Sequence, residues 1–461
     1  QMKLKPVDSA LLSAVYALNP FMINLSLSFM TDVPAVALTN WALFASIVAL
    51  KKKRFTYWLI SVLCLTASMA TRQSALILLP PIYLAGLITL KDNKDRALLL
   101  STLLIPFFTY TYLQDWLLQA SMIPSGYTSF SGMAQNSILT LLCSPWKIIV
   151  SVAQGLCYVG LALMPVTLAL AVCGLRSKNA RLYTGIAAVL AVLFVAAPLA
   201  SQQIQGAFMP YSLNLFMPPI LGSYCLVGGV PFWRAEHLKI FTYVADIAAV
   251  ATAFCVVMSV LKPAELLADM QKSDELCRRI FLAVLVACVT GGLLVQLSVS
   301  NFDRYYMVAL APLLVCLAPL WRDLNPLKLR AITVALVVAI GAYGTIATMD
   351  VMNFTRAQWQ AIRQLEAQKI PAKRIDGGPI YDIYAGGLPL TQGFKQGQGW
   401  PDSMRGTPET CKLRWWPLVK DDYIIAADTV NGYHATSKLK YWSPIFWRYR
   451  TIYTLKSDKL N

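Results

Sequence analysis

Eight polar residues near the ends of apolar segments are the side chains of this chain best suited to chemistry. Arginine donates two parallel hydrogen bonds to a phosphate, and a carboxylate can accept the proton of a hydroxyl group. Such a set predicts a site that holds a lipid phosphate and deprotonates an acceptor hydroxyl. Its members are Asp32, Arg72, Gln73, Asn214, Asp303, Arg304, Tyr305 and Tyr306.

Each charged residue of this set also has a structural interpretation, which the sequence leaves open. Asp32 lies in the run FMTDVP at the edge of an apolar segment. An unpaired carboxylate is costly there and is therefore a candidate functional group. It could instead cap the next helix, with the proline that follows in the first turn. Arg72 could extend to lipid head groups, and Asp303 could pair with Arg304 for structural reasons.

The elements that position these residues are predicted to be transmembrane helices. The chain is 57% hydrophobic and 14% charged, with a mean hydropathy of +0.54, which is more apolar surface than one soluble core can bury. Apolar segments recur at about the length that crosses a bilayer. They predict eleven spans, near residues 9–27, 34–50, 55–71, 74–90, 97–113, 148–172, 182–199, 239–260, 280–298, 306–320 and 331–347.

The basic loops between the spans predict the orientation, because Lys and Arg near span ends are retained on the cytoplasmic side. The basic clusters, each after an even number of spans, are at 2–5, 51–54, 91–96, 176–181, 262–279 and 322–330. We therefore expect a multi-pass protein of the plasma (inner) membrane with a cytoplasmic N-terminus. Loops 114–147, 200–238 and 299–305 then lie outside, as do the eight polar residues.

The tail changes character and predicts a second domain. We expect a transmembrane domain at 1–349 and a small exterior α/β domain at 350–461, periplasmic or extracellular. Thr355–Ile370 has the apolar spacing of an amphipathic helix. Strands are predicted at 374–378, 423–427 and 451–455. The many tryptophans and tyrosines of the tail could stack on sugar rings, pack in a core or anchor the domain at the membrane surface.

Charge and cysteine content argue against other kinds of site. The net charge of +17 is scattered over short loops, which fits topology and contact with membrane lipids rather than nucleic acid. Seven of the ten cysteines lie in or beside apolar spans. A bridge between Cys143 and Cys411 stays open. With two histidines and no acid pair at Asp32, we expect neither a metal nor a cofactor.

Several short motifs together resemble prokaryotic glycosyltransferase family 39. They are the run FMTDVP, Arg72-Gln73, the LNL sequence around Asn214, Asp303 to Tyr306 ahead of Ala311-Pro312, and Ile375 to Gly378. That family has the GT-C fold and is related to protein O-mannosyltransferases and to the lipid A aminoarabinose transferase. The resemblance covers most of the chain, and it implies a GT-C-like polytopic α-helical membrane protein.

The resemblance implies transfer of a sugar from a polyprenyl-phosphate carrier to an acceptor on the exterior face, with inversion at the anomeric carbon. The acceptor would be a protein hydroxyl, a lipid head group or a glycan. By position, Asp32 would be catalytic, and Arg72 and Arg304 would bind the donor phosphate. The remaining residues of the set, which are Gln73, Asn214, Asp303, Tyr305 and Tyr306, would contact substrate.

One departure from the family pattern concerns its principal acid. That acid lies in the first exterior loop, and no position here matches it. Thirteen spans are common in the family, whereas eleven are predicted here in the matching orientation. We therefore expect that two spans and their loop precede Gln1, and that the chain as given lacks the main catalytic carboxylate.

Three alternatives to an active transferase remain. A transporter or lipid flippase would also have many spans, and Asp246 inside the 239–260 span is the feature that favours it. An inactive transferase homologue would keep the fold without the chemistry. A noncatalytic scaffold would use its tail to bind a partner.

Overall fold

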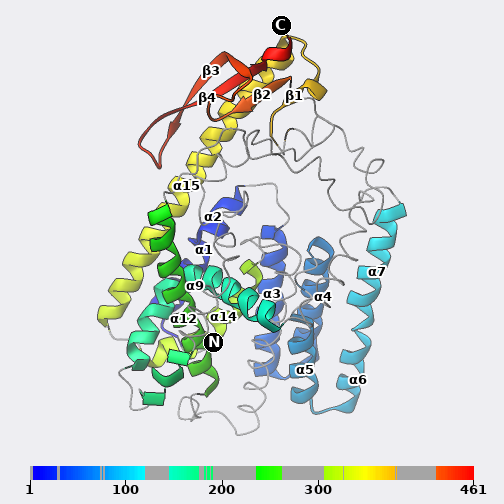
Figure 1. The fold of residues 1–461 in the computed structure, drawn as a ribbon. Helices are drawn as coiled ribbons and strands as arrows, with labels where there is room; N and C mark the ends of the chain where they lie inside the picture. The colour runs from blue at the N-terminus through cyan, green and yellow to red at the C-terminus, as the bar shows by residue number, and fades with distance from the viewer. Residues whose placement is uncertain are drawn as a thin grey trace. The chain divides into compact units, whose positions relative to one another are not determined.

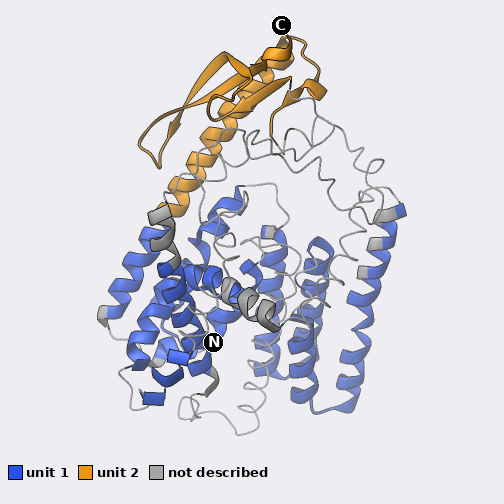
Figure 2. Ribbon diagram, viewed as in Figure 1, with its two compact units in different colours: residues 1–120, 134–208, 240–342 blue, residues 121–133, 209–239, 343–461 orange. Residues whose placement is uncertain are grey.

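The structure is a computed structural model with two compact units. It describes residues 4–27, 32–72, 75, 78–119, 145–175, 181–182, 184–186, 188–189, 235–261, 306–324, 327–378, 381 and 422–460. Residues 1–120, 134–208 and 240–342 form the first unit, and residues 121–133, 209–239 and 343–461 form the second (Figure 2). Each unit is described by itself below.

The described part of the first unit is helical, and α12 and α15 extend from it into residues of the second unit (Figure 1). Their bounds are α1 Pro6–Ala17, α2 Pro20–Ser26, α3 Asp32–Lys52, α4 Phe55–Thr71, α5 Leu79–Thr89, α6 Asn93–Ser101, α7 Leu104–Gln119, α9 Pro145–Leu175, α12 Ala235–Leu261 and α14 Met307–Leu324, followed by α15 Leu327–Ala367. Four described helices are long and apolar enough to cross a membrane, namely Val33–Lys52, Asn93–Leu113, Gly155–Leu175 and Leu329–Ala367. These helices fit the predicted polytopic membrane protein, while the count of eleven spans stays a prediction.

The predicted span 9–27 is wrong as a single helix. Here α1 and α2 meet at 63°. Pro20 has no N–H to continue the hydrogen bonding of α1, and the Asn19 side chain accepts the Phe21 N–H at 2.9 Å to cap α2. The chain therefore bends at this asparagine-proline pair. The predicted spans at 182–199 and 280–298 lie largely or wholly outside the described residues.

Helices α9 and α12 approach each other closely at a glycine. A Cβ atom on Gly160 would lie 2.7 Å from the backbone of Ala248 and Ala249, so only glycine fits. One turn or more along the pair, the Thr252 hydroxyl donates to the Thr167 hydroxyl at 3.2 Å. Small residues and hydroxyl contacts of this kind are typical of helix pairs within a membrane.

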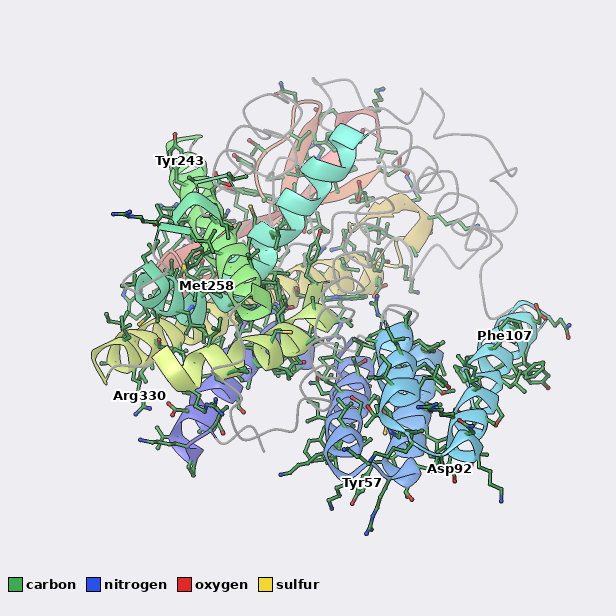
Figure 3. The ribbon with its side chains drawn as sticks, turned by 90° about the horizontal axis from the view of Figure 1, so that it is seen from below. Tyr57, Asp92, Phe107, Tyr243, Met258 and Arg330 are labelled. Atoms are coloured by element: carbon green, nitrogen blue, oxygen red, sulfur yellow. The ribbon has the colours of Figure 1, made fainter. Side chains whose placement is uncertain are left out.

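A buried acid joins α1 to α14 and α15. Asp8 accepts the Trp321 indole N–H at 3.1 Å and pairs with the Arg330 guanidinium at 2.9 Å; Figure 3 labels Arg330. Asp8 follows the first predicted cytoplasmic cluster, and Arg330 ends the last one. The contact therefore joins the start of α1 to the start of α15, while the cytoplasmic placement of the two basic clusters stays a prediction.

The second unit packs the C-terminal part of α15 on a four-stranded sheet (Figure 1). The strands are β1 Ile375–Asp376, β2 Tyr423–Ala426, β3 Tyr433–Ser443 and β4 Arg448–Ser457, in the order β1-β2-β4-β3. Among the described strands, β1 and β2 pair in parallel and the other neighbours pair antiparallel. The core contains Phe354, Ala361, Ile362 and Leu365 of the helix against Ile375, Ile425, Tyr441 and Ile452.

Three predicted strands are confirmed, since β1, β2 and β4 overlap 374–378, 423–427 and 451–455. The predicted helices at 331–347 and 355–370 are both present, but as parts of one helix, because α15 continues from Leu327 to Ala367. Residues 348–354 contain neither proline nor glycine, so nothing interrupts the helix. The strand β3 was not predicted from the sequence.

Candidate functional site

Two paired helices, α3 and α4, position two of the predicted site residues, the catalytic candidate Asp32 and the phosphate-binding candidate Arg72. Their connection is short: Lys53 and Arg54 separate the helices, and Lys53 has a positive φ of 51° that reverses the chain. Lys52 donates to the Tyr57 hydroxyl at 2.9 Å beside this connection, and Figure 3 labels Tyr57. The basic connection marks one end of the pair, so Asp32 and Arg72 belong to the other end.

Hydroxyl groups fix the register between α3 and α4. Ser61 donates to the Ala42 carbonyl oxygen at 2.8 Å, and Ser68 donates to the Ala35 carbonyl oxygen at 2.7 Å. Thr39 and Ser68 also share a hydrogen bond of 2.8 Å. All these side chains are buried, and small residues let the two backbones approach.

This register brings the two predicted charges to one level. Asp32 precedes Ala35 by three residues, and Arg72 follows Ser68 by four, so each lies about one turn beyond the last fixed contact. Asp32 is the first residue of α3, and Arg72 is the C-cap of α4. Both residues therefore lie at the same end of the helix pair, while their place in a site on the exterior face stays a prediction.

The electrostatics of this end suit both a functional and a structural role for the two charged residues. The negative Asp32 stands at a helix N-terminus and the positive Arg72 at a helix C-terminus, where each helix dipole favours them. Arg72 is half-buried, its backbone is extended, and its N–H donates to the Ser68 carbonyl oxygen at 2.7 Å. An acid and a guanidinium held by two packed helices can position a phosphate and accept a proton.

Tyr306 precedes α14 and lies in the core of the first unit. Its side chain is only 1% exposed, and its ring stacks on Tyr158 of α9, with 5.5 Å between the ring centroids and 19° between their planes. Sequence analysis did not single out Tyr158, since one tyrosine in an apolar helix carries no signal of a partner. Contact of Tyr306 with a donor stays a prediction.

The other predicted site residues lie outside the described residues. They are Gln73, Asn214, Asp303, Arg304 and Tyr305. Cys143 and Cys411 lie outside them as well. Assembly of all eight side chains into one site therefore stays a prediction, and the described part of the site consists of the α3–α4 end and Tyr306.

Two buried acids in the first unit have partners of their own. Asp8 is paired with Arg330 and Trp321, as described above. Asp246 of α12 lies among α9 residues, and the Cys157 thiol donates to it at 3.7 Å. Within the part of the chain that the structure describes, no group of three or more His, Cys, Asp or Glu side chains could hold a metal ion.

Comparison with known proteins adds one match. Residues 2–112 match the family model described as dolichyl-phosphate-mannose-protein mannosyltransferase. That stretch runs from α1 into α7 and contains both Asp32 and Arg72. Searches of curated proteins and of solved structures found no match. The family match and the long apolar helices together support a membrane glycosyltransferase of the mannosyltransferase type.

Proposed function

We propose that this chain transfers a sugar from a polyprenyl-phosphate carrier to an acceptor on the exterior face of the membrane, in the manner of prokaryotic family 39 transferases. The observation that carries the proposal is the family match over 2–112. It coincides with the part of the chain in which α3 and α4 hold an acid and an arginine at one level. Such a pair suits a reaction between a hydroxyl and a lipid phosphate.

The proposed reaction is a direct displacement. The acceptor oxygen bonds to the anomeric carbon as the bond from that carbon to the phosphate oxygen breaks, and the carbon is inverted. The hydroxyl proton passes to the Asp32 carboxylate, and the electron pair leaves with the phosphate. Arg72, with Arg304, offsets the charge that develops on the leaving group. Because phosphate is a good leaving group, orientation and charge stabilisation are the main tasks of the protein.

Assignment of the active end can be tested with Asp32→Asn. The full-length protein is reconstituted in vesicles with radiolabelled polyprenyl-phosphate mannose and an acceptor-containing membrane extract. We expect label transfer to fall by about 10²–10⁴-fold, the usual contribution of a general base. Unchanged transfer by the folded variant would show that Asp32 is not catalytic.

Asp92→Asn is the matched control. Asp92 also stands at a helix start, where it caps α6 through the Lys94 N–H at 2.9 Å, and it is exposed. Asparagine keeps this cap. Asp32 is the first residue of α3, and the connection of α5 to α6 lies at the opposite end of the helices from the start of α3 (Figure 1), so the control should retain full transfer.

The transporter alternative rests on Asp246, which is a buried acid on a long apolar helix. The same vesicles separate the two functions, because a transporter moves the labelled lipid to the other leaflet without cleaving it. Lipid movement that needs Asp246, in the absence of transfer from a panel of polyprenyl-phosphate sugars, would replace the proposed transferase by a transporter.

A further inference from the structure

The tip of the β3–β4 hairpin, residues 442–450, exposes a group of aromatic rings. Trp447 is 80% exposed and Tyr449 is 68% exposed. Both pack edge-on against Trp442, with ring centroids 5.6 and 5.3 Å apart. Trp447 has a φ of 52°, a backbone conformation that is rare for a bulky residue. The turn therefore holds a large apolar ring out into the surroundings.

The same hairpin is strongly basic. Residues 433–457 contain five Lys or Arg residues and no Asp or Glu; the basic residues are Lys438, Lys440, Arg448, Arg450 and Lys456. At the tip, the Arg448 guanidinium lies 5.4 Å from the centre of the Phe446 ring and is exposed. A surface with this charge attracts an anionic partner.

Contacts with α15 fix the depth of the tip relative to the apolar part of that helix. The Asn353 amide donates to the Trp442 carbonyl oxygen at 3.0 Å. The buried Asp350 carboxylate accepts the Ser443 hydroxyl and the Ile445 backbone N–H. The tip is thus tied to residues 350–353 of α15.

Those residues stand at the end of the exposed apolar stretch of α15. Large apolar side chains are exposed along this helix as far as Met352, namely Ile332, Val334, Val338, Ile346, Met349 and Met352. A helix of this length and composition can cross a membrane, and exposed apolar side chains on it suit contact with lipid. At 1.5 Å per residue, the tip is anchored within about one turn of the point where this stretch ends.

We propose that the hairpin tip docks on the surface of an anionic bilayer. Trp447 and Tyr449 enter the head-group region, where tryptophan and tyrosine concentrate in membrane proteins, and Arg448 binds lipid phosphates. Carbohydrate would stack on exposed rings as well. Lipid explains more of these features than carbohydrate does, because the rings lie beside cations and at the depth where an apolar helix leaves the membrane.

Photocrosslinking tests the proposal with the full-length protein in vesicles. Benzoylphenylalanine replaces Trp447 in one variant and Ala435 in a control variant. Ala435 is exposed on the same strand, about 26 Å from Ser443 at 3.3 Å per residue. The vesicles are phosphatidylcholine alone or with phosphatidylglycerol, and a polymeric glycan is added in a parallel sample.

We expect position 447 to label lipid at least about fivefold more than position 435. Adding Arg448→Gln should lower the labelling of phosphatidylglycerol about fivefold, the effect of one basic residue at an anionic surface. Equal labelling at the two positions would overturn the docking, and labelling indifferent to phosphatidylglycerol would overturn the role of Arg448. Crosslinks to the glycan in place of lipid would assign the tip to carbohydrate.

Discussion

Asp32 and Asp350 both stand at the edge of an apolar helical stretch, yet their surroundings differ. Asp32 begins α3 at the level of Arg72, and the nearest fixed contacts of that end are those of Ala35 and Ser68. Asp350 lies inside α15 and is buried. Its carboxylate accepts hydrogen bonds from a serine hydroxyl and a backbone N–H of the hairpin turn. The partners of Asp350 give it a structural role, whereas the chemical role of Asp32 stays a prediction.

The most decisive test of the proposed active end is the variant Arg72→Ala. Loss of a positive charge that stabilises a leaving phosphate should lower sugar transfer by about 10²–10³-fold with little change in unfolding temperature. Arg54→Ala is the control, because Arg54 is exposed at the opposite end of the same helix pair. Equal losses in the two variants, measured in the vesicle assay, would remove the special role of the Arg72 end.

Asp8 is a buried acid whose role we expect to be structural. A double-mutant cycle with Asp8→Ala and Arg330→Met should give a coupling free energy of about 2 kcal/mol in denaturant unfolding, below the value for fully buried pairs because Arg330 is a quarter exposed. Transfer per folded molecule should be unchanged. A large loss of transfer with normal stability would place Asp8 among the chemical acids instead.

Asp350 should behave in the same way on a smaller scale. Asp350→Ala leaves the Ser443 hydroxyl and the Ile445 N–H without their acceptor, which costs about 1–3 kcal/mol. Hydrogen exchange should show faster exchange at 443–447, and transfer by folded molecules should persist. Ser443→Ala is the milder companion variant, and wild-type protection of the turn in both would contradict this role.

The smallest expected effect concerns Tyr441, whose ring packs on Phe354 beside the hairpin. Burial raises its pKa to about 12; the nearby Arg450 lowers it and Asp350 raises it. Folded Tyr441 therefore keeps its proton to higher pH than the unfolded chain does. Its contribution to stability is fully present below pH 10 and is lost as pH rises through about 12.

Tyr441→Phe should therefore make the unfolding temperature fall less steeply above pH 10. A difference titration at the tyrosinate absorption band should show one group missing near pH 12. A missing group near pH 10 would mean that Tyr441 is accessible to water, and the packing of the hairpin on α15 would then need revision.

Local sequence patterns predicted the helix pair well. Apolar runs at 34–50 and 55–71 end within two residues of α3 and α4, because the basic connection interrupts them. That Asp32 and Arg72 lie at the same end of the pair follows from this alternation. The strand β3 was missed since it carries Lys438 and Lys440 and lies at the sheet edge, where charged residues replace the usual apolar alternation.

Long-range partners could not be predicted from local patterns. Asp350 and Ser443 are 93 residues apart, and Asp8 and Arg330 are 322 apart. No local sequence pattern near either acid indicates such a partner.

The hydroxyl contacts between α3 and α4 also determine which changes of chain length the proposed active end can absorb. One residue inserted between Ala35 and Asp32 would turn position 32 about 100° around its helix and move it about 1.5 Å along the axis, which changes its place relative to Arg72. One residue added at Lys53 would leave Asp32 and Arg72 where they are, since Ser61 and Ser68 hold the register. Sequences that share this chemistry should therefore vary in length at the basic connection and keep a constant spacing along the two helices.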